Sequence, residues 1–312
     1  MTNLKPQIFI GSSGNGIDAA KIVKSELSAL GDAYLWSESD LWEPNDSTFD
    51  NLLRMSGYFD FGVFVATADD LTLTSKGEYN FEARDNVILE MALFVGALGK
   101  KKSFLLIENG VDKPSDFLGI FMPEFQKGDI NSLKEKCLEI GPKITENYNA
   151  GHLSLYPTTA LAIGYYKNFV ADLVASMQIA NEIEINGVKF SDFKLKVVIP
   201  KDLKGRVKEK ASLFYKKHGF AENSLQTPIR KHPLWFQLDP KSAPLAIMYD
   251  MPSTLTGIDD AIEMKLEKAY KGRTKLQEII EQRELNNFRK VLKIMLETSP
   301  FAVANVEIVD EF

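Results

Sequence analysis

The sequence has few residues that could cross-link the chain or bind a metal ion. Its 312 residues include one cysteine, Cys137, and three histidines. A single cysteine cannot form a disulfide within the chain, and so few histidines and thiols leave little scope for a zinc site. The sequence therefore predicts a fold without an internal disulfide, and neither a metal ion nor another cofactor is expected.

Long apolar segments and an export signal are also missing. The longest mostly apolar run, Val87–Leu98, is interrupted by Glu90 and is well short of the roughly 20 residues that a helix needs to span a bilayer. The first residues, MTNLKPQIFIG, lack the basic, apolar and small-residue regions of a secretory signal. We therefore expect a cytoplasmic protein that has no membrane partner.

Charge is distributed unevenly along the chain. Residues 1–150 contain 14 Lys and Arg against 23 Asp and Glu, whereas residues 151–312 contain 23 against 20. At roughly 100–200 residues per domain, the length predicts two domains, and the contrast in charge suggests that they bind different ligands. Neither half is basic enough to indicate a nucleic acid polymer as partner. The mildly basic second half could still hold a small anionic ligand.

Strands alternate with helices in the first half, which predicts a parallel sheet covered by helices on both faces. Ligands of such α/β sheets bind at the carboxyl ends of the strands. The expected strands are Gln7–Ile10, Ala33–Ser37, Phe59–Ala66 and Ser103–Ile107, and the expected helices are Ile17–Leu30, a segment from about Ser47, and Arg84–Leu98.

The alternation breaks around residues 140–157, where Gly141, Pro142 and Pro157 fall, and we expect the linker there. The predicted domains are residues 1–145 and 152–312, the second of them α+β. Its expected helices are Thr158–Ala180, Leu203–Lys217, Leu255–Tyr270 and Thr274–Leu296; its expected strands are Lys194–Ile199, Ile229–Leu238, Leu245–Tyr249 and a hairpin turning at Asn186-Gly187.

Two features of the first half suggest chemistry. The turn GSSGNG, Gly11–Gly16, would present backbone N–H groups to a phosphate, although a plain strand-to-helix turn explains it equally well. Glu90 borders the apolar stripe of its predicted helix, where a carboxylate can hold ribose hydroxyls or stabilise an oxocarbenium ion. From the residues alone, a favourable place early in a helix is the simpler explanation of Glu90.

Five ordered segments resemble bacterial TIR-like nucleotide-binding domains: IFIGSS, LW, EP, FDFGVFV and RDNVILE. The resemblance implies a flavodoxin-like fold and, as in many members, cleavage of NAD⁺ to nicotinamide and a form of ADP-ribose. It implies that Glu90 is the catalytic residue, because Glu90 is the glutamate of the RDNV-x-x-E motif. The residues that it implies around the NAD⁺ are Ser12, Ser13, Trp36 and the loop Asp40–Asn45, Asn45 included.

In the second half, the segment Tyr249–Thr254 places a carboxylate and two hydroxyls at the end of a strand. Asp250 could accept hydrogen bonds from a guanine edge while Thr254 donates to a phosphate, and Arg230 and Lys231 could neutralise that phosphate. The same group could instead cap the helix that follows, and the sequence alone favours the cap.

Three further segments resemble the cyclic-dinucleotide-binding domain of STING proteins: TALAIGYYKNFV, LKVVIP and YDMPSTL. The resemblance implies that Phe169 stacks on a base of the ligand. It also implies that Asp250 and Thr254 recognise cyclic di-GMP, and that Arg230 is the lid-strand arginine that contacts the ligand.

Together the two resemblances identify the chain as a bacterial TIR–STING fusion. They imply an antiphage effector of the CBASS type: a homodimer that binds a cyclic dinucleotide, assembles into higher oligomers or filaments and, as an NAD⁺ glycohydrolase, causes abortive infection. NAD⁺ is then the substrate and cyclic di-GMP the activating ligand. One alternative is a non-catalytic TIR scaffold assembled by the cyclic dinucleotide. A weaker alternative, suggested only by the strand order and the glycine-rich turn, is a nucleotide- or flavin-binding electron carrier.

Overall fold

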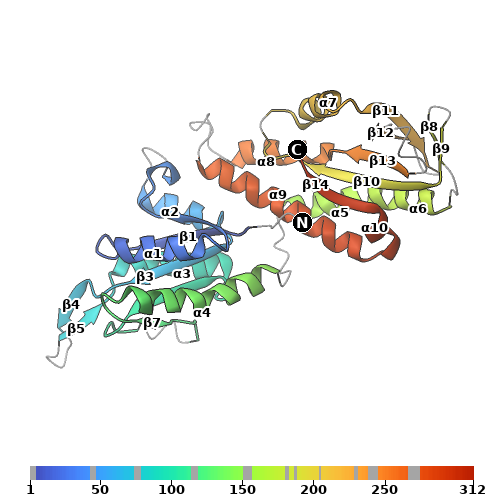
Figure 1. Ribbon diagram of the computed structural model, residues 1–312. Coiled ribbons are helices and arrows are strands. Elements are labelled where there is room, and N and C mark those ends of the chain that lie inside the picture. The colour runs from blue at the N-terminus through green and yellow to red at the C-terminus, as the bar shows by residue number, and fades with distance from the viewer. Residues whose placement is uncertain are drawn as a thin grey trace. The chain divides into compact units, whose positions relative to one another are not determined.

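The computed structural model describes residues 5–42, 47–73, 79–113, 119–149, 157–179, 183–185, 188–203, 205–227, 231–237, 245–265 and 275–312. These residues form two compact units (Figure 1). The N-terminal unit comprises the described residues up to 149 together with 275–283, and the C-terminal unit comprises those of 157–265 and 284–312. The division at residues 145–152 stays a prediction, because residues 150–156 lie outside the described part.

A five-stranded sheet forms the centre of the N-terminal unit. Its strand order is β2-β1-β3-β6-β7, and every neighbouring pair is parallel. This is the flavodoxin-like order, in which the chain reverses its direction of winding between β1 and β3. The predicted fold class is therefore confirmed. The strands are β1 Gln7–Ser12, β2 Asp32–Leu35, β3 Phe61–Ala66, β6 Ser103–Glu108 and β7 Glu124–Phe125.

Helices cover both faces of this sheet. The helices α1 (Ile17–Leu27) and α4 (Ile130–Asn149) pack on each other and on the apolar cluster of one face. On the other face, α2 (Thr48–Ser56) packs on α3 (Asp85–Leu98), and α3 packs on β3. The predicted start near Ser47 is confirmed, because the Ser47 hydroxyl accepts from the backbone N–H of Asp50 at 3.0 Å and so caps α2.

One element of the N-terminal half was not predicted, and one expectation was wrong. The polar segment after β3 contains an antiparallel hairpin, β4 (Asp70–Leu73) and β5 (Tyr79–Glu82). The helix α4 continues through Gly141 and Pro142 to Asn149, so these residues do not begin a linker. A proline inside a helix removes one hydrogen bond and crowds the preceding turn. Here the buried stripe of α4 outweighs that cost, and its members are Leu133, Cys137, Ile140 and Ile144.

The C-terminal unit begins with a long helix, as predicted for residues 158–180. It consists of α5 (Pro157–Tyr165), one π-helical turn η3 (Tyr166–Val170) and α6 (Ala171–Ile179). Such π turns occur frequently at functional sites. A short hairpin, β8 (Ile183–Ile185) and β9 (Val188–Phe190), follows with Ile185 opposite Val188; the two predicted turn residues between them lie outside the described part.

A mixed five-stranded sheet completes this unit, which confirms the α+β prediction. Its order is β11-β12-β13-β10-β14, with the first two pairs antiparallel and the last two parallel. The strands are β10 Asp192–Ile199, β11 Ala221–Gln226, β12 Lys231–Gln237, β13 Leu245–Asp250 and β14 Val306–Asp310. The other helices of this unit are α7 Val207–Lys217, η5 Ser253–Leu255, α8 Thr256–Lys265 and α10 Pro300–Asn305. The helix α9, Lys275–Glu297, contributes residues 275–283 to the N-terminal unit and 284–297 to this one.

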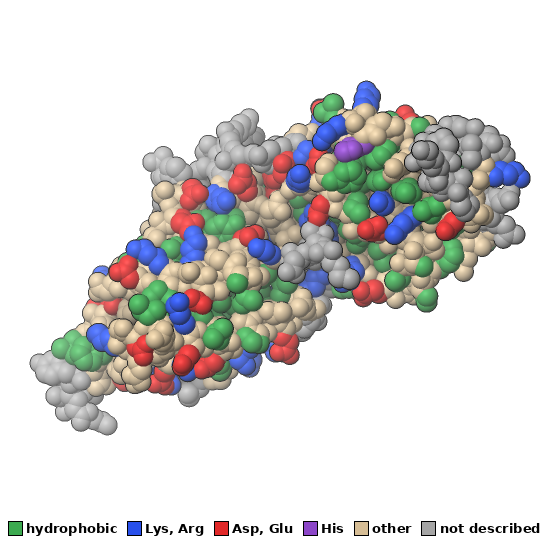
Figure 2. Space-filling view, in the orientation of Figure 1, with side chains coloured by type: hydrophobic (Ala, Val, Ile, Leu, Met, Phe, Trp, Pro, Cys, Tyr) green, Lys and Arg blue, Asp and Glu red, His purple; other side chains and the backbone are tan. Residues whose placement is uncertain are grey.

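The surface carries both signs of charge. On the face drawn in Figure 2, Lys and Arg are intermixed with Asp and Glu over both units, with no broad field of one sign among the described side chains. No helix that the structure describes is both long and apolar enough to cross a membrane.

Aromatic rings fill the space between the N-terminal sheet and α3. Phe9 stacks on Phe94 with ring centroids 4.8 Å apart, and Phe64 meets Phe94 edge-on at 5.2 Å. Gly62 leaves room for this cluster, since a Cβ atom at Gly62 would lie 2.6 Å from Cδ1 of Phe94 and 2.9 Å from Cε2 of Phe64.

We expect Gly62→Ala to destabilise the protein by about 1–3 kcal/mol, the usual cost of forcing an extra methyl group into a packed core. Gly96→Ala is the matched control, because a Cβ there meets nothing within 4 Å and alanine favours a helix interior by up to about 1 kcal/mol. Urea unfolding measures both changes. Equal stability of Gly62→Ala and the wild type would contradict the packing described here.

Candidate functional site

The first candidate site lies at the carboxyl edge of the N-terminal sheet, where β1 ends. Ser12 and Ser13 are both buried there. The indole Nε1–H of Trp36, which follows β2, donates to the Ser12 hydroxyl at 2.9 Å. Three of the residues predicted to surround NAD⁺ therefore lie together.

Ser13 links the turn after β1 to the loop after β3. Its hydroxyl accepts from the backbone N–H of Gly16 at 3.0 Å and lies 3.4 Å from the hydroxyl of Thr67. Thr67 in turn donates to Asp69 at 2.8 Å. These bonds fix the backbone between β1 and β3, the point in the strand order at which doubly wound sheets bind their ligands.

Glu90 lies beneath this turn, in the second turn of α3. A Cβ atom at Gly11 would lie 3.2 Å from Oε2 of Glu90, so the missing side chain of Gly11 lets the strand pass close to the carboxyl group. Oε2 is buried and has no hydrogen-bond partner among the described residues. Burial raises the pKa of Glu90 to about 7, because a carboxylate loses its solvation there.

This geometry disfavours the simpler explanation of Glu90. The interaction of a carboxylate with the helix dipole falls off within the first turn, and in α3 that place is occupied by Asp85. A half-buried carboxyl group whose pKa is near neutrality, and whose oxygen has no hydrogen-bond partner among the described residues, is instead typical of a functional site.

The loop after β2 is fixed up to Trp42. The indole N–H of Trp42 donates to the backbone carbonyl of Trp36, and the Glu38 carboxylate accepts from the backbone N–H of Leu35 at 3.0 Å. Asp40 is exposed in the short 3₁₀ helix η1, Ser39–Leu41. Asn45 lies outside the described residues, so its place beside NAD⁺ stays a prediction.

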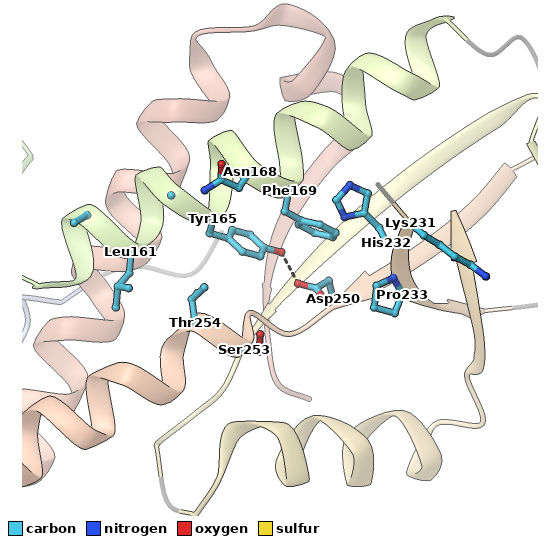
Figure 3. A pocket seen from close by; sticks show the side chains of 12 residues that line it. Leu161, Tyr165, Asn168, Phe169, Lys231, His232, Pro233, Asp250, Ser253 and Thr254 are labelled. Carbon is cyan, nitrogen blue, oxygen red and sulfur yellow. Dashed lines mark hydrogen bonds between the residues drawn. The ribbon is translucent and has the colours of Figure 1, made fainter. Parts of the chain in front are cut away.

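The second candidate site is a cavity of about 490 Å³ in the C-terminal unit (Figure 3), within the size range of sites for small ligands. Phe169, Asp250 and Thr254, all predicted to bind the ligand, line it. Arg230 lies outside the described residues, but its neighbour Lys231 lines the cavity. The described residues that line it are Ala160, Leu161, Gly164, Tyr165, Asn168, Phe169, Lys231, His232, Pro233, Asp250, Ser253 and Thr254.

Asp250 accepts a hydrogen bond from another element that lines the cavity, and not from the turn that follows it in the sequence. Its Oδ2 accepts from the hydroxyl of Tyr165 at 2.6 Å, and the dashed line in Figure 3 marks this bond. Burial raises the pKa of Asp250 to about 6, although the bond from Tyr165 opposes the shift. The 3₁₀ turn η5 has no side-chain cap. The helix-cap prediction for Asp250 was therefore wrong.

Thr254 and Phe169 complete the polar and aromatic parts of the wall. Oγ1 of Thr254 is buried and has no hydrogen-bond partner among the described residues, so it can serve a ligand. The Phe169 ring lies 5.2 Å from the Tyr165 ring and 5.2 Å from that of His232, centroid to centroid. Lys231 adds a positive charge at the rim, where it is exposed.

Sequence reasoning did not select Tyr165 or His232. Tyr165 stands four residues before Phe169, and this spacing puts two aromatic rings on one side of a helix, but such pairs are common in cores. His232 has no local motif at all. Its position becomes informative only once β12 is placed beside Phe169.

Two family models match the chain. The model described as "Prokaryotic STING domain" matches residues 157–293, and the model described as "CAP12/Pycsar effector protein, TIR domain" matches residues 7–127. These matches define the class of the protein: a TIR domain followed by a STING domain.

Relatives match along the whole chain. CD-NTase-associated protein 12 of Flavobacterium daejeonense is 38% identical, over 99% of this chain and 100% of that protein. The protein of the same name from Lachnospiraceae bacterium (strain RUG226) is 36% identical, over 98% and 99%. A solved structure, "Bacterial STING in complex with c-di-GMP", is 36% identical and covers 52% of this chain and 99% of that chain, with a TM-score of 0.48. The chain therefore belongs to the bacterial TIR–STING family whose curated members are named CD-NTase-associated protein 12.

The raised pKa of Glu90 makes a prediction about stability. Below pH about 4.5 the carboxyl group is protonated in both the folded and the unfolded chain, so it costs nothing. As the pH rises toward 7 the unfolded chain ionises first, and folding stability is lost. We expect Glu90→Gln to stabilise the protein by about 1–3 kcal/mol at pH 8 and by much less at pH 5. Thermal or urea unfolding at both values measures the difference.

The matched control is Glu135→Gln, which removes an exposed carboxylate from α4 and should change stability little at either pH. A stabilisation by Glu90→Gln that was equal at pH 5 and pH 8 would contradict the desolvated state of Glu90.

Proposed function

We propose that the chain hydrolyses NAD⁺ in its TIR domain when a cyclic dinucleotide binds its STING domain. The observation that carries the proposal is the desolvated carboxyl group of Glu90 at the carboxyl edge of a doubly wound sheet. Its Oε2 has no hydrogen-bond partner in the part of the chain that the structure describes. The role of an antiphage effector is what the resemblance of the sequence implies, and it belongs to the same proposal. The relatives' name, CD-NTase-associated protein 12, suggests a CD-NTase as the source of the ligand.

In the proposed reaction, the bond between the nicotinamide nitrogen and C1′ of its ribose breaks, and the electron pair leaves with nicotinamide. The ribosyl group becomes cationic, and ionised Glu90 stabilises that charge from a site with little water. A water molecule then adds its oxygen to C1′ and releases a proton, which gives ADP-ribose. A pKa near 7 leaves a large part of Glu90 ionised at neutral pH.

The surrounding residues suit the rest of NAD⁺. The amino end of α1, directly after the turn that holds Ser12 and Ser13, favours an anionic pyrophosphate. Trp36 offers an aromatic face, and its indole N–H is already held by Ser12. These side chains orient the substrate, whereas Glu90 acts on the bond that breaks.

The STING cavity suits a ligand with bases and phosphates. Phe169 offers a ring for stacking, Thr254 a bare hydroxyl and Lys231 a cation for phosphate. The Asp250 carboxylate retains acceptor capacity beyond its bond from Tyr165, so it can accept from N1–H and N2–H₂ of guanine. Cyclic di-GMP, with two guanines, is therefore the proposed ligand.

A cyclic dinucleotide is nearly two-fold symmetric, which suits a homodimer that presents the same cavity twice. Binding would favour one arrangement of dimers and allow them to assemble into higher oligomers or filaments in which the TIR sites become active. Without NAD⁺ cleavage, the same assembly would make the chain a signalling scaffold, and the next measurement separates the two functions.

We expect cyclic di-GMP to raise both nicotinamide release and particle size in light scattering on the same samples. Glu90→Gln should lower nicotinamide release by at least about 10²–10³-fold, the usual effect of removing a preorganised electrostatic group, and leave cyclic di-GMP binding intact. Glu135→Gln is the control with wild-type activity. Near-wild-type turnover in Glu90→Gln would refute the catalytic assignment, and ligand-driven assembly without NAD⁺ loss would favour the scaffold.

We expect affinity to fall in the order cyclic di-GMP, cyclic GMP–AMP, cyclic di-AMP, because adenine lacks the paired donors that Asp250 accepts. An unsatisfied buried partner costs about 1–3 kcal/mol. Asp250→Ala should flatten the order, whereas Phe169→Ala should weaken all three ligands alike, since stacking depends little on the base. Calorimetric titration measures these affinities. Equal affinity of the wild type for cyclic di-AMP and cyclic di-GMP would overturn the role of Asp250.

A further inference from the structure

One buried carboxylate holds both arms of the hairpin formed by β11 and β12. Oδ2 of Asp172, in the first turn of α6, accepts from the hydroxyl of Thr227 at 2.7 Å and lies 2.6 Å from Nε2 of His232. Because a carboxylate accepts, we assign the donated proton to Nε2. The side chains of His232 and Asp172 are only 3% and 7% exposed.

Thr227 and His232, two partners of Asp172, flank the segment that joins β11 to β12. Thr227 directly follows β11, and His232 is the second residue of β12. In the register of the two strands Leu225 pairs with His232 and Gln226 with Lys231. One side chain of α6 thus binds the end of one strand and the start of the next.

The same group of residues touches the aromatic wall of the cavity. Asp172 is three residues after Phe169, just beyond the π-helical turn that carries that ring. The imidazole of His232 meets the Phe169 ring edge-on, at 5.2 Å between centroids and 70° between planes. Figure 3 shows His232 and Phe169 side by side at one end of the cavity, with Lys231 beyond. His232 therefore lies between the carboxylate and the ring proposed to stack on a base.

We infer that Asp172, Thr227 and His232 form a latch that holds the β11–β12 hairpin against α6 and sets the orientation of Phe169 for the ligand. They are positioning residues: the latch acts on the ligand through Phe169 and through the hairpin that brings Lys231 to the cavity. The inference rests on the proposed function of the cavity, but the latch itself exists without ligand and can be tested without it.

The first experiment uses the ligand-free full chain. Thr227→Val keeps the shape of the side chain and removes its hydroxyl, while Thr227→Ser keeps the hydroxyl. Without the Thr227 hydroxyl the Asp172 carboxylate loses the bond that ties it to the end of β11. That arm of the hairpin should then open more often. We expect amide hydrogen exchange in residues 221–237 to be about tenfold or more faster in Thr227→Val and in Asp172→Asn than in the wild type.

The matched controls should exchange as the wild type does. They are Thr227→Ser and Glu222→Gln, which changes an exposed carboxylate on the same hairpin. If Thr227→Val and Thr227→Ser exchanged equally, the latch would be refuted whether or not the chain binds any ligand. Thr227→Val leaves all charges in place and serves as the test if Asp172→Asn does not fold.

The second experiment follows dissociation of cyclic di-GMP. An unlatched hairpin should release the ligand faster, so we expect the dissociation rate to rise about tenfold in Thr227→Val, with a small change in the association rate. His232→Asn combined with Phe169→Leu should weaken binding by less than the product of the two single effects, because both act on the same ring. If the latch were merely structural, the variants would have a lower unfolding midpoint. Thr227→Val would then release the ligand at the wild-type rate, and the double variant would weaken binding by the product of the two single effects.

The proposed function and the latch can be refuted independently of each other. A wild-type chain that bound no cyclic dinucleotide would overturn the proposed function, while hydrogen exchange would still decide the latch. Wild-type binding together with wild-type dissociation in Thr227→Val and Asp172→Asn would overturn the positioning role and leave the proposed function standing.

Discussion

Water solvates a carboxylate strongly, and burying one is unfavourable unless hydrogen bonds replace that water. Each unit of this chain withdraws a carboxyl group partly from water near the carboxyl ends of its strands. Glu90 has no replacement partner for Oε2, and its pKa rises to about 7. Asp250 has one, the hydroxyl of Tyr165, and its pKa rises to about 6. Both groups are thus destabilised in a way that a suitable ligand would relieve: a cation at Glu90, hydrogen-bond donors at Asp250.

Aromatic packing maintains both environments. Around Glu90 the rings of Phe9, Phe64 and Phe94 fill the space under the sheet, and Gly11 lets the strand approach the carboxyl group. Around Asp250 the support runs through a chain of contacts from β12 to the residue after Asp250. Trp235 on β12 stacks on Tyr215 at 4.6 Å, and the Tyr215 hydroxyl accepts from the backbone N–H of Met251. The strand β12, which borders the cavity, and the backbone directly after Asp250 are therefore held by the same two rings.

Local patterns predicted the features of this chain that depend on neighbours in sequence. The alternation of strands and helices gave the parallel sheet, and the apolar stripe of α3 placed Glu90 at its margin. Prediction from the sequence failed where contacts between residues far apart in the chain determine the structure. The polar strand β11 has no apolar alternation, α4 overrides Pro142 through its buried stripe, and Asp250 pairs with a tyrosine 85 residues away instead of capping the next helix. The roles of Asn45 and Arg230 stay predictions.

In the proposed function, occupancy of the STING cavity controls the chemistry at Glu90. If activation follows occupancy of the cavity, a variant that binds cyclic di-GMP more weakly needs proportionally more of it for activation. The most direct measurement determines, for wild type and Asp250→Ala, the cyclic di-GMP concentrations that give half-maximal binding and half-maximal nicotinamide release. We expect both concentrations to rise together in the variant. Weaker binding with an unchanged activation curve, or NAD⁺ loss at full rate without ligand, would contradict it.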